Sequence, residues 1–128
     1  MWTYRCYDLG GSKNLWQQWF DDTLAVHGSH ESVFDFLEGR DNWSRPHAAF
    51  LDPRNRIIEI RLADAANIEW RILGFYGGQR REFIVTAVCY KKQNIYDPKD
   101  IRKTAVKRKN EIEANPAKAI ACDRPTKA

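Results

Sequence analysis

The sequence predicts a single α+β domain in which helices pack on a small, mainly antiparallel sheet. Three observations predict this class. The chain has 128 residues, which suits one domain. Its second half holds three consecutive strand-like stretches separated by turn formers, and apolar residues recur at helical spacing before and after them. The expected order is β-α-α-β-β-β-α, with one domain over residues 1–115 and a flexible tail over residues 116–128.

The first part of the chain is expected to form one strand and two helices. Residues 2–8 alternate and are rich in aromatic side chains, which is typical of a strand. Residues 12–26 carry apolar side chains at helical spacing. The pair Gly28-Ser29 is expected to interrupt the helical segment before a second helix that ends at Gly39. Residues 41–55 contain two prolines and several turn formers, so we expect a loop there.

Three strands are expected over residues 56–62, 68–76 and 82–91. The pair Gly77-Gly78 favours a hairpin between the second and the third. The third strand is apolar on both faces in its centre, which is typical of a central strand covered on both sides. Consecutive strands joined by short turns predict antiparallel pairing.

The last helix has the clearest boundaries in the sequence. Asp97 is a good N-cap, Pro98 suits the first helical position, and Asn115-Pro116 is expected to end the helix. Its predicted inner face follows steps of four, three and four residues through Ile101, Ala105, Arg108 and Ile112. We therefore expect a helix from about residue 98 to residue 114.

Positive charge is concentrated in one segment. The whole chain has a net charge of +4, but residues 91–109 hold eight Lys or Arg against two Asp, a net charge of +6. Residues 1–90 hold 10 Lys or Arg against 12 Asp or Glu, a net charge of −2. A local basic segment attracts polyanions and raises their encounter rate.

The remaining composition excludes several classes of function. The three cysteines, Cys6, Cys89 and Cys122, are an odd number without CxxC spacing, which argues against a disulfide framework or a zinc site. Cys89 is expected to be a small core residue. The three histidines lack metal-ligand spacing and no nucleotide-binding motif is present, so we expect neither metal nor cofactor. No apolar run reaches the roughly 18 residues of a membrane span and no signal peptide is evident, so the expected location is the cytoplasm.

Two arginines lie inside predicted strands, where a charge needs a partner or a cleft open to water. Arg71 either pairs with Glu69 or Glu59, or is a cation held on the sheet to bind a ligand. Arg61 has Glu59 two residues away on its own face, so ion pairing across the sheet is the alternative to a functional role.

Two further groups of residues suit phosphate or RNA. Lys91 and Lys92 end the last strand directly before Tyr96 and the final helix, where lysine charge, a tyrosine hydroxyl and free backbone N–H groups favour phosphate binding. The second group is Lys99, Lys103 and Lys107, which recur at four-residue steps along the last predicted helix. This stripe of lysines is either a solvated helix face or a surface for RNA or a partner.

The order and spacing of these segments resemble the RelE/HigB toxin superfamily, and most closely its phage-derived branch. The similar segments are Ile57–Arg61, Trp70–Tyr76, Ala87–Lys92 and the helix that begins at Asp97-Pro98, within residues 56–114. Members of this branch typically have a Glu-Leu-Arg strand, a Tyr-Arg strand, a Lys-Lys pair and a final helix that begins with proline.

The resemblance implies the toxin of a type II toxin–antitoxin system, an endoribonuclease that enters the ribosome and cuts mRNA. Its partners would be the ribosome, mRNA and a helix-turn-helix antitoxin. Arg71 would stabilise charge on the scissile phosphate. The other residues at matching positions are Glu59, Arg61, Lys91, Lys92 and, more loosely, Tyr96.

Such an enzyme uses the 2′-hydroxyl of the RNA as nucleophile and needs a base, an acid and cations at the phosphate. Glu59, Tyr96 or a lysine could move the proton, and the sequence does not choose between them. Two alternatives stay open: a ParE-like inhibitor of DNA gyrase and a non-catalytic RNA-binding domain. The nuclease hypothesis requires the cations of neighbouring strands to meet at one spot that water can reach.

Overall fold

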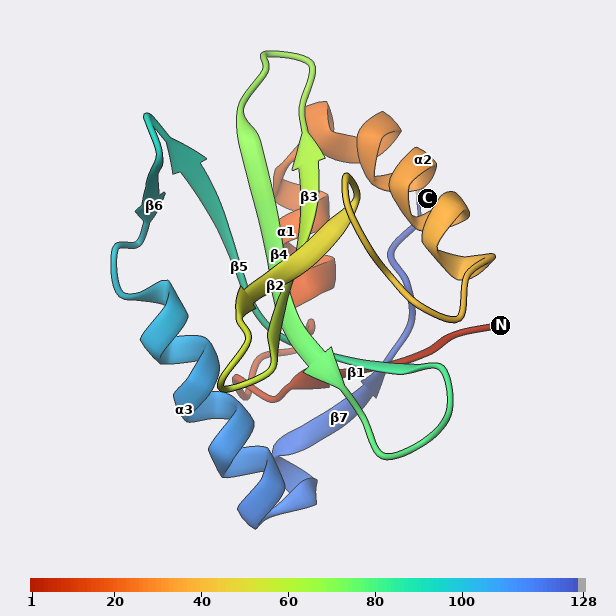
Figure 1. Ribbon diagram of the computed structural model, residues 1–128, viewed down its shortest axis with the longest axis vertical. Coiled ribbons are helices and arrows are strands. Elements are labelled where there is room, and N and C mark those ends of the chain that lie inside the picture. Colours follow the sequence, from red (N-terminus) through yellow and green to blue (C-terminus); the bar gives the residue numbers. More distant parts are fainter. Residues whose placement is uncertain (127–128) are drawn as a thin grey trace.

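The fold is that of a computed structural model, of which residues 1–126 are described (Figure 1). It is an α+β domain with an open sheet and three α-helices. The strands are β1 (Thr3–Tyr7), β2 (Ala48–Asp52), β3 (Ile57–Ala63), β4 (Glu69–Tyr76), β5 (Glu82–Lys92), β6 (Ile95–Asp97) and β7 (Ala119–Cys122). The helices are α1 (Leu15–Asp22), α2 (His27–Glu38) and α3 (Ile101–Ala114), with short 3₁₀ turns over Leu24–Val26 and Pro116–Lys118.

The sheet has the strand order β2-β3-β4-β5-β1-β7, and β6 pairs with β5 beside this path. The pairs β2–β3, β3–β4, β4–β5, β5–β6 and β1–β7 are antiparallel. The pair β1 and β5 is parallel. The predicted mainly antiparallel sheet is therefore confirmed, and the strands from the two ends of the chain, β1 and β7, follow β5 in the sheet.

Helices α1 and α2 cover one face of the sheet with large aromatic side chains. Trp16 of α1 and Phe34 of α2 are fully buried and pack on each other with 5.1 Å between ring centroids. Alternate residues of the sheet, such as Ile60 and Ile72, complete this core from below. We call this side the aromatic face; its apolar residues alternate with those of the opposite side, as a pleated strand requires.

Helix α3 packs on the opposite face, which we call the α3 face. Its inner side chains Ile101, Ala105 and Ile112 are buried, so the face predicted from the sequence spacing is confirmed. Arg108, the fourth residue of that face, donates from Nη1 to the backbone oxygen of Thr86 at 2.8 Å. Strand β5 is thus covered on both sides, which explains its continuous apolar centre.

A β-bulge at Thr86 interrupts the regular pairing of β4 with β5. Leu73 pairs with Ala87, whereas the next residue, Gly74, pairs with Val85, so Thr86 is the extra residue. The Thr86 hydroxyl donates to the Leu73 oxygen at 3.2 Å. Gly74 is required here because a Cβ at that position would collide with the backbone oxygen of Ile84. The bulge exchanges the two faces for the residues of β5 that follow it.

Several element boundaries differ from the sequence prediction. The first helix begins at Leu15, after Asn14 caps it by accepting from the Gln17 N–H. The second helix does not break at Gly28-Ser29 but runs unbroken over His27–Glu38. The predicted loop over residues 41–55 contains the edge strand β2, which proline and turn formers at its flanks had hidden.

The start of the last helix was predicted too early. Asp97 is not its N-cap; it ends β6 and accepts a hydrogen bond from the Tyr90 hydroxyl at 2.7 Å. Helix α3 begins at Ile101, four residues later. The short strand β6 had no signal because three residues are too few for a periodic pattern.

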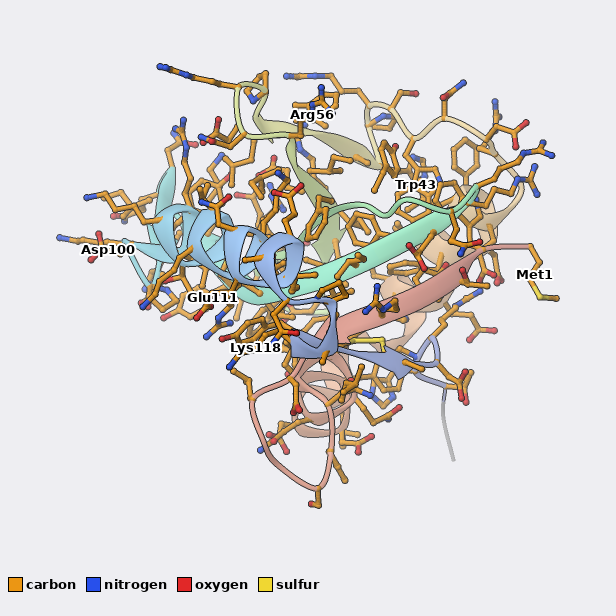
Figure 2. The ribbon with its side chains drawn as sticks, turned by 90° about the horizontal axis from the view of Figure 1, so that it is seen from below. Met1, Trp43, Arg56, Asp100, Glu111 and Lys118 are labelled. Carbon is orange, nitrogen blue, oxygen red and sulfur yellow. A yellow bond between two sulfur atoms is a disulfide. The ribbon has the colours of Figure 1, made fainter. Side chains whose placement is uncertain are left out.

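The prediction of a flexible tail is wrong for residues 116–122. After a 3₁₀ turn, β7 pairs with β1 in the register Tyr4 to Cys122 and Tyr7 to Ala119. A disulfide joins Cys6 to Cys122 across this pair, with 5.9 Å between the Cα atoms (Figure 2). The expectation of no disulfide is thus also wrong, because the two cysteines are 116 residues apart and only tertiary pairing brings them together. Residues 127–128 lie outside the described part of the chain.

None of the helices formed by residues 1–126 combines the length and the apolar composition that crossing a bilayer requires.

Candidate functional site

The site is centred on the carboxylate of Glu59, on the α3 face of β3. Its side chain is only 4% exposed. One carboxylate oxygen, Oε2, accepts from Arg61 Nε at 2.8 Å and lies 3.8 Å from Arg71 Nε. The other oxygen, Oε1, accepts a short hydrogen bond from the Tyr96 hydroxyl. A buried carboxylate is stable only with such partners, so Glu59 organises the cations around it.

Arg71 is buried and neutralised. Its side chain is 6% exposed, Nη2 is 3.1 Å from Glu69 Oε1, and Nη1 donates to the Trp70 backbone oxygen at 2.9 Å. Its Nε lies 3.8 Å from Glu59 Oε2 and has no hydrogen-bond partner among residues 1–126, so Arg71 is held by ion pairs to Glu59 and Glu69. The ion-pair interpretation that the sequence left open for Arg71 is therefore the one observed. The expectation that Arg71 contacts a phosphate directly has no support in this geometry. Arg71 instead holds Glu59 and Glu69 on two neighbouring strands.

Arg61 is the accessible arginine of this group. It pairs directly across the sheet with Arg71 in the β3–β4 register. Its side chain is 31% exposed, and it bonds Glu59 through Nε alone. Within residues 1–126 no hydrogen bond or ion pair is found for its two terminal nitrogens. A guanidinium held at Nε with its terminal fork facing water is arranged to bind an oxyanion.

Tyr96 reaches the cluster from β6. Its backbone pairs with Lys91 at the end of β5, and its hydroxyl donates to Glu59, two strands further across the sheet. Burial, and then the hydrogen bond to Glu59, raise the pKa of Tyr96 far above its usual range. The hydroxyl therefore stays protonated at neutral pH and keeps a lone pair free to accept a proton.

The two lysines at the end of β5 lie on opposite faces of the sheet. Lys91 pairs with Glu69 across the β4–β5 ladder and thus shares the α3 face with Arg71. Its ammonium lies 5.4 Å from the centre of the Tyr96 ring, and among residues 1–126 it has no carboxylate within ion-pair distance. Lys92 is the next residue and points to the other side. The structure therefore brings Lys91, but not Lys92, to the cluster.

The bulge at Thr86 decides which lysine joins. Strict alternation from Phe83, whose side chain lies on the aromatic face, would leave every odd-numbered residue of β5 on that face. The extra residue reverses the alternation, so Cys89 and Lys91 lie on the α3 face instead. The sequence prediction treated the lysines as a pair because it contained no signal for the bulge.

The stripe of lysines on α3 lies apart from this cluster. Lys99 precedes the helix, while Lys103 and Lys107 line a groove of about 820 Å³ between α3 and the turn after β2. In that groove Arg102 pairs with the buried carboxylate of Asp52 at 3.0 Å. All three lysines are exposed, and the structure gives them no contact with Glu59 or Tyr96.

Two other features of the site concern metals and thiols. Among residues 1–126, no three His, Cys, Asp or Glu side chains converge as they would around a metal ion. Cys89 lies buried beneath the cluster, and this burial raises the pKa of its thiol to about 12, as expected of a core residue. The polar groups gathered at the site are a carboxylate, a phenol and the two accessible cations Arg61 and Lys91.

Such a set suits proton transfer beside an anion. Glu59 and Tyr96 form a hydrogen-bonded pair that can take up a proton, and the accessible charges of Arg61 and Lys91 flank it on two sides. Groups fixed in this way stabilise developing negative charge without reorganising.

Comparison with protein-family models, with curated proteins and with solved structures finds no match to this chain.

Proposed function

We propose that this protein is an endoribonuclease that cleaves mRNA on the ribosome, and that it acts as the toxin of a type II toxin–antitoxin pair. The proposal is supported by the sequence resemblance to RelE/HigB toxins and by one observation on the site. That observation is the Tyr96–Glu59 hydrogen bond with Arg61 and Lys91 beside it.

The proposed reaction begins at the 2′-hydroxyl of the RNA. Its proton passes to the Tyr96 oxygen while the Tyr96 proton passes to Glu59. The 2′-oxygen then bonds to the adjacent phosphorus, the bond from phosphorus to the 5′-oxygen breaks, and a 2′,3′-cyclic phosphate forms. The Lys91 ammonium donates a proton to the departing 5′-oxygen. No oxidant, metal or cofactor is needed, and each proton has a named donor and acceptor.

Arg61 binds the phosphate in this mechanism, and Arg71 positions the groups that react. The terminal nitrogens of Arg61 offer the two parallel N–H bonds that suit a phosphate. Arg71 has no such freedom because Glu59 and Glu69 both hold it. Its guanidinium holds Glu59 in place as the acceptor of the Tyr96 proton.

Cell-free translation with mapping of cleaved mRNA ends tests the proposal, run with and without ribosomes. We expect cleavage by the wild type only when ribosomes are present. Tyr96→Phe removes the proton relay and Arg61→Ala removes the phosphate cation, and each should slow cleavage by about 10²–10³-fold. Arg80→Ala is the matched control, since Arg80 is an exposed arginine at the opposite end of the β4–β5 ladder. It should cleave like the wild type.

Other outcomes identify the alternatives. Growth arrest without mRNA cleavage, together with loss of gyrase supercoiling activity, would instead indicate a ParE-like protein. RNA binding that is unaffected by Tyr96→Phe, without any cleavage, would indicate a non-catalytic RNA-binding domain. A folded Tyr96→Phe variant that cleaves as fast as the wild type would refute the relay.

The proposal also assigns partners. A helix-turn-helix antitoxin would neutralise the protein, and Lys99, Lys103 and Lys107 would contact ribosomal RNA or mRNA through charge alone. Each lysine that binds a phosphate should contribute about one unit to the salt dependence of binding. Salt titrations of RNA binding by Lys103→Ala and Lys107→Ala measure that contribution.

A further inference from the structure

A second cavity lies at the open end of the β4–β5 ladder, next to the cluster. It has a volume of about 490 Å³, within the range of about 300–1,000 Å³ that is usual for small-ligand sites. The turn before β4 forms one wall with Asn67, Ile68 and Glu69, and residues 90–93 form the other. In Figure 1 these two walls are the turn between β3 and β4 and the turn between β5 and β6. We call this cavity the terminal pocket.

The turn that forms the first wall is held rigidly by a buried carboxylate. Asp64 accepts from the backbone N–H groups of Ala66 and Ile68 at 2.8 and 3.0 Å and from the indole N–H of Trp70 at 3.0 Å. The Trp70 bond, with those backbone bonds, holds the pKa of Asp64 below its usual range. The turn therefore keeps its shape over the whole physiological pH range, and the pocket wall is formed before any ligand arrives.

The side chains in the terminal pocket combine three kinds of contact. Lys91 and Lys92 supply positive charge, Asn67 and Gln93 supply amides that can donate and accept, and Ile68 is an apolar side chain left 42% exposed. Lysines bind phosphates, and amides match the hydrogen-bonding edges of bases. An exposed apolar side chain offers a surface for the face of a base.

The terminal pocket is joined to the cluster by two residues that belong to both. Lys91 lines the pocket and lies 5.4 Å from the Tyr96 ring, while Glu69 lines it and binds Arg71. A chain whose phosphate lies at Arg61 and Lys91 would therefore place a neighbouring nucleotide at the pocket.

We propose that the terminal pocket binds one nucleotide of single-stranded RNA, next to the phosphate that is cleaved, and that Asn67 and Gln93 contact the edge of its base. The inference rests on the proposed function for its choice of RNA as ligand. It adds the site at which the enzyme distinguishes one base from another.

Binding of short RNA tests the pocket without requiring cleavage. The probes are four 5′-fluorescein-labelled RNA tetramers, each built from a single kind of nucleotide, and fluorescence anisotropy gives their affinities for the intact protein. The test variant is Asn67→Gly with Gln93→Gly. Glycine is chosen because Asn67 and Gln93 have φ values of +62° and +52°, which glycine adopts without strain.

The control is Asn94→Gly, because Asn94 also has a positive φ, of +64°, and lies in the same turn as Gln93 but does not line the pocket. We expect the double variant to bind the preferred tetramer about 5- to 100-fold more weakly, the loss typical of one to two base contacts. Asn94→Gly should bind like the wild type. Lys92→Ala should weaken all four tetramers about equally, because it removes a phosphate contact only.

The outcomes separate this inference from the proposed function. If the folded double variant binds all four tetramers like the wild type, the pocket inference is wrong, whatever the cleavage assay shows. If no tetramer binds while Arg61→Ala still abolishes mRNA cleavage, the pocket inference fails and the nuclease proposal stands. If the tetramers bind through the pocket but mRNA is not cut, the pocket inference stands and the nuclease proposal fails.

Discussion

The two faces of the sheet are built on different principles. The aromatic face is closed by interlocking rings from α1, from α2 and from the segment that follows α2: Trp16, Phe34 and Trp43. The α3 face is only partly covered, and beyond the end of α3 it carries Glu59 and Arg71, buried with their charges. One face is therefore stabilised by apolar packing, whereas the other gives up part of that packing to hold buried charged groups in place.

Truncating the aromatic face should cause the largest loss. Phe34→Ala removes a fully buried ring that contacts Tyr4, Trp16 and His30, and we expect it to lower the free energy of unfolding by about 3–5 kcal/mol. Phe50→Ala, at a ring left 55% exposed on β2, should cost less than about 1 kcal/mol. Urea denaturation measures both. Equal losses would refute the assignment of stability to the aromatic face.

Breaking the ionic cluster of the α3 face should cause the next-largest loss of stability. Glu59→Met leaves the buried Arg71 without the more deeply buried of its two carboxylate partners. It should lower the free energy of unfolding by about 3 kcal/mol. Glu69→Met is the matched control, because Glu69 also binds Arg71 but is 51% exposed, and it should cost less than about 1 kcal/mol.

The double variant Glu59→Met with Arg71→Met sharpens this test. Removing both charges leaves no buried ion unpaired, so it should be more stable than Glu59→Met alone, yet inactive in mRNA cleavage. A double variant less stable than both single variants would show that the cluster stabilises the fold rather than serving function.

Opening the disulfide should have an intermediate effect. The Cys6–Cys122 bond closes a loop of more than a hundred residues, and we expect Cys122→Ser to lower the free energy of unfolding by about 2–4 kcal/mol. A reducing compartment would open the same bond, so a protein that acts on cytoplasmic ribosomes must remain folded without it. Denaturation of the wild type with and without reductant measures the effect. Complete unfolding on reduction would contradict a cytoplasmic site of action.

The last prediction concerns the pH dependence of stability, which His30 on the aromatic face should cause and which is small for each pH unit. Its Nε2 accepts from the Trp16 indole N–H at 3.0 Å, and burial, together with the charges of Arg124 and His27, lowers its pKa to about 3. The unfolded chain therefore takes up this proton first, near pH 6.5. Stability should fall as the pH drops below about 6.5, by about 1.4 kcal/mol per pH unit, until the pH approaches the folded-state pKa.

Comparison with His30→Gln isolates this contribution. Glutamine can still accept from Trp16 but does not titrate, so the slope between pH 6.5 and about 4.5 should be lost in the variant. Denaturation curves across that interval measure the slope. A wild-type slope identical to that of the variant would show that His30 is not held neutral.

Much of the fold could be predicted from local signals. The three strands from residue 56 to residue 92 have strong alternation or apolar runs, and Ile101, Ala105 and Ile112 have helical spacing, so both were found. Strands β6 and β7 were missed because three and four residues are too few for a periodic pattern, and β2 was missed because proline and turn formers flank it. They form because a sheet edge already present supplies their hydrogen bonds.

The sequence by itself determined the candidate site residues: Glu59, Arg61, Arg71, Lys91, Lys92 and Tyr96 were named from strand positions, from the basic segment and from the family resemblance. Only the tertiary structure decided which of them lie together. The bulge at Thr86 selects Lys91 over Lys92, and the cross-strand partners of Arg71 bury its charge. The physical reason is that a shift of one residue reverses every side chain of a strand, and the register that sets this shift depends on residues far away in the chain.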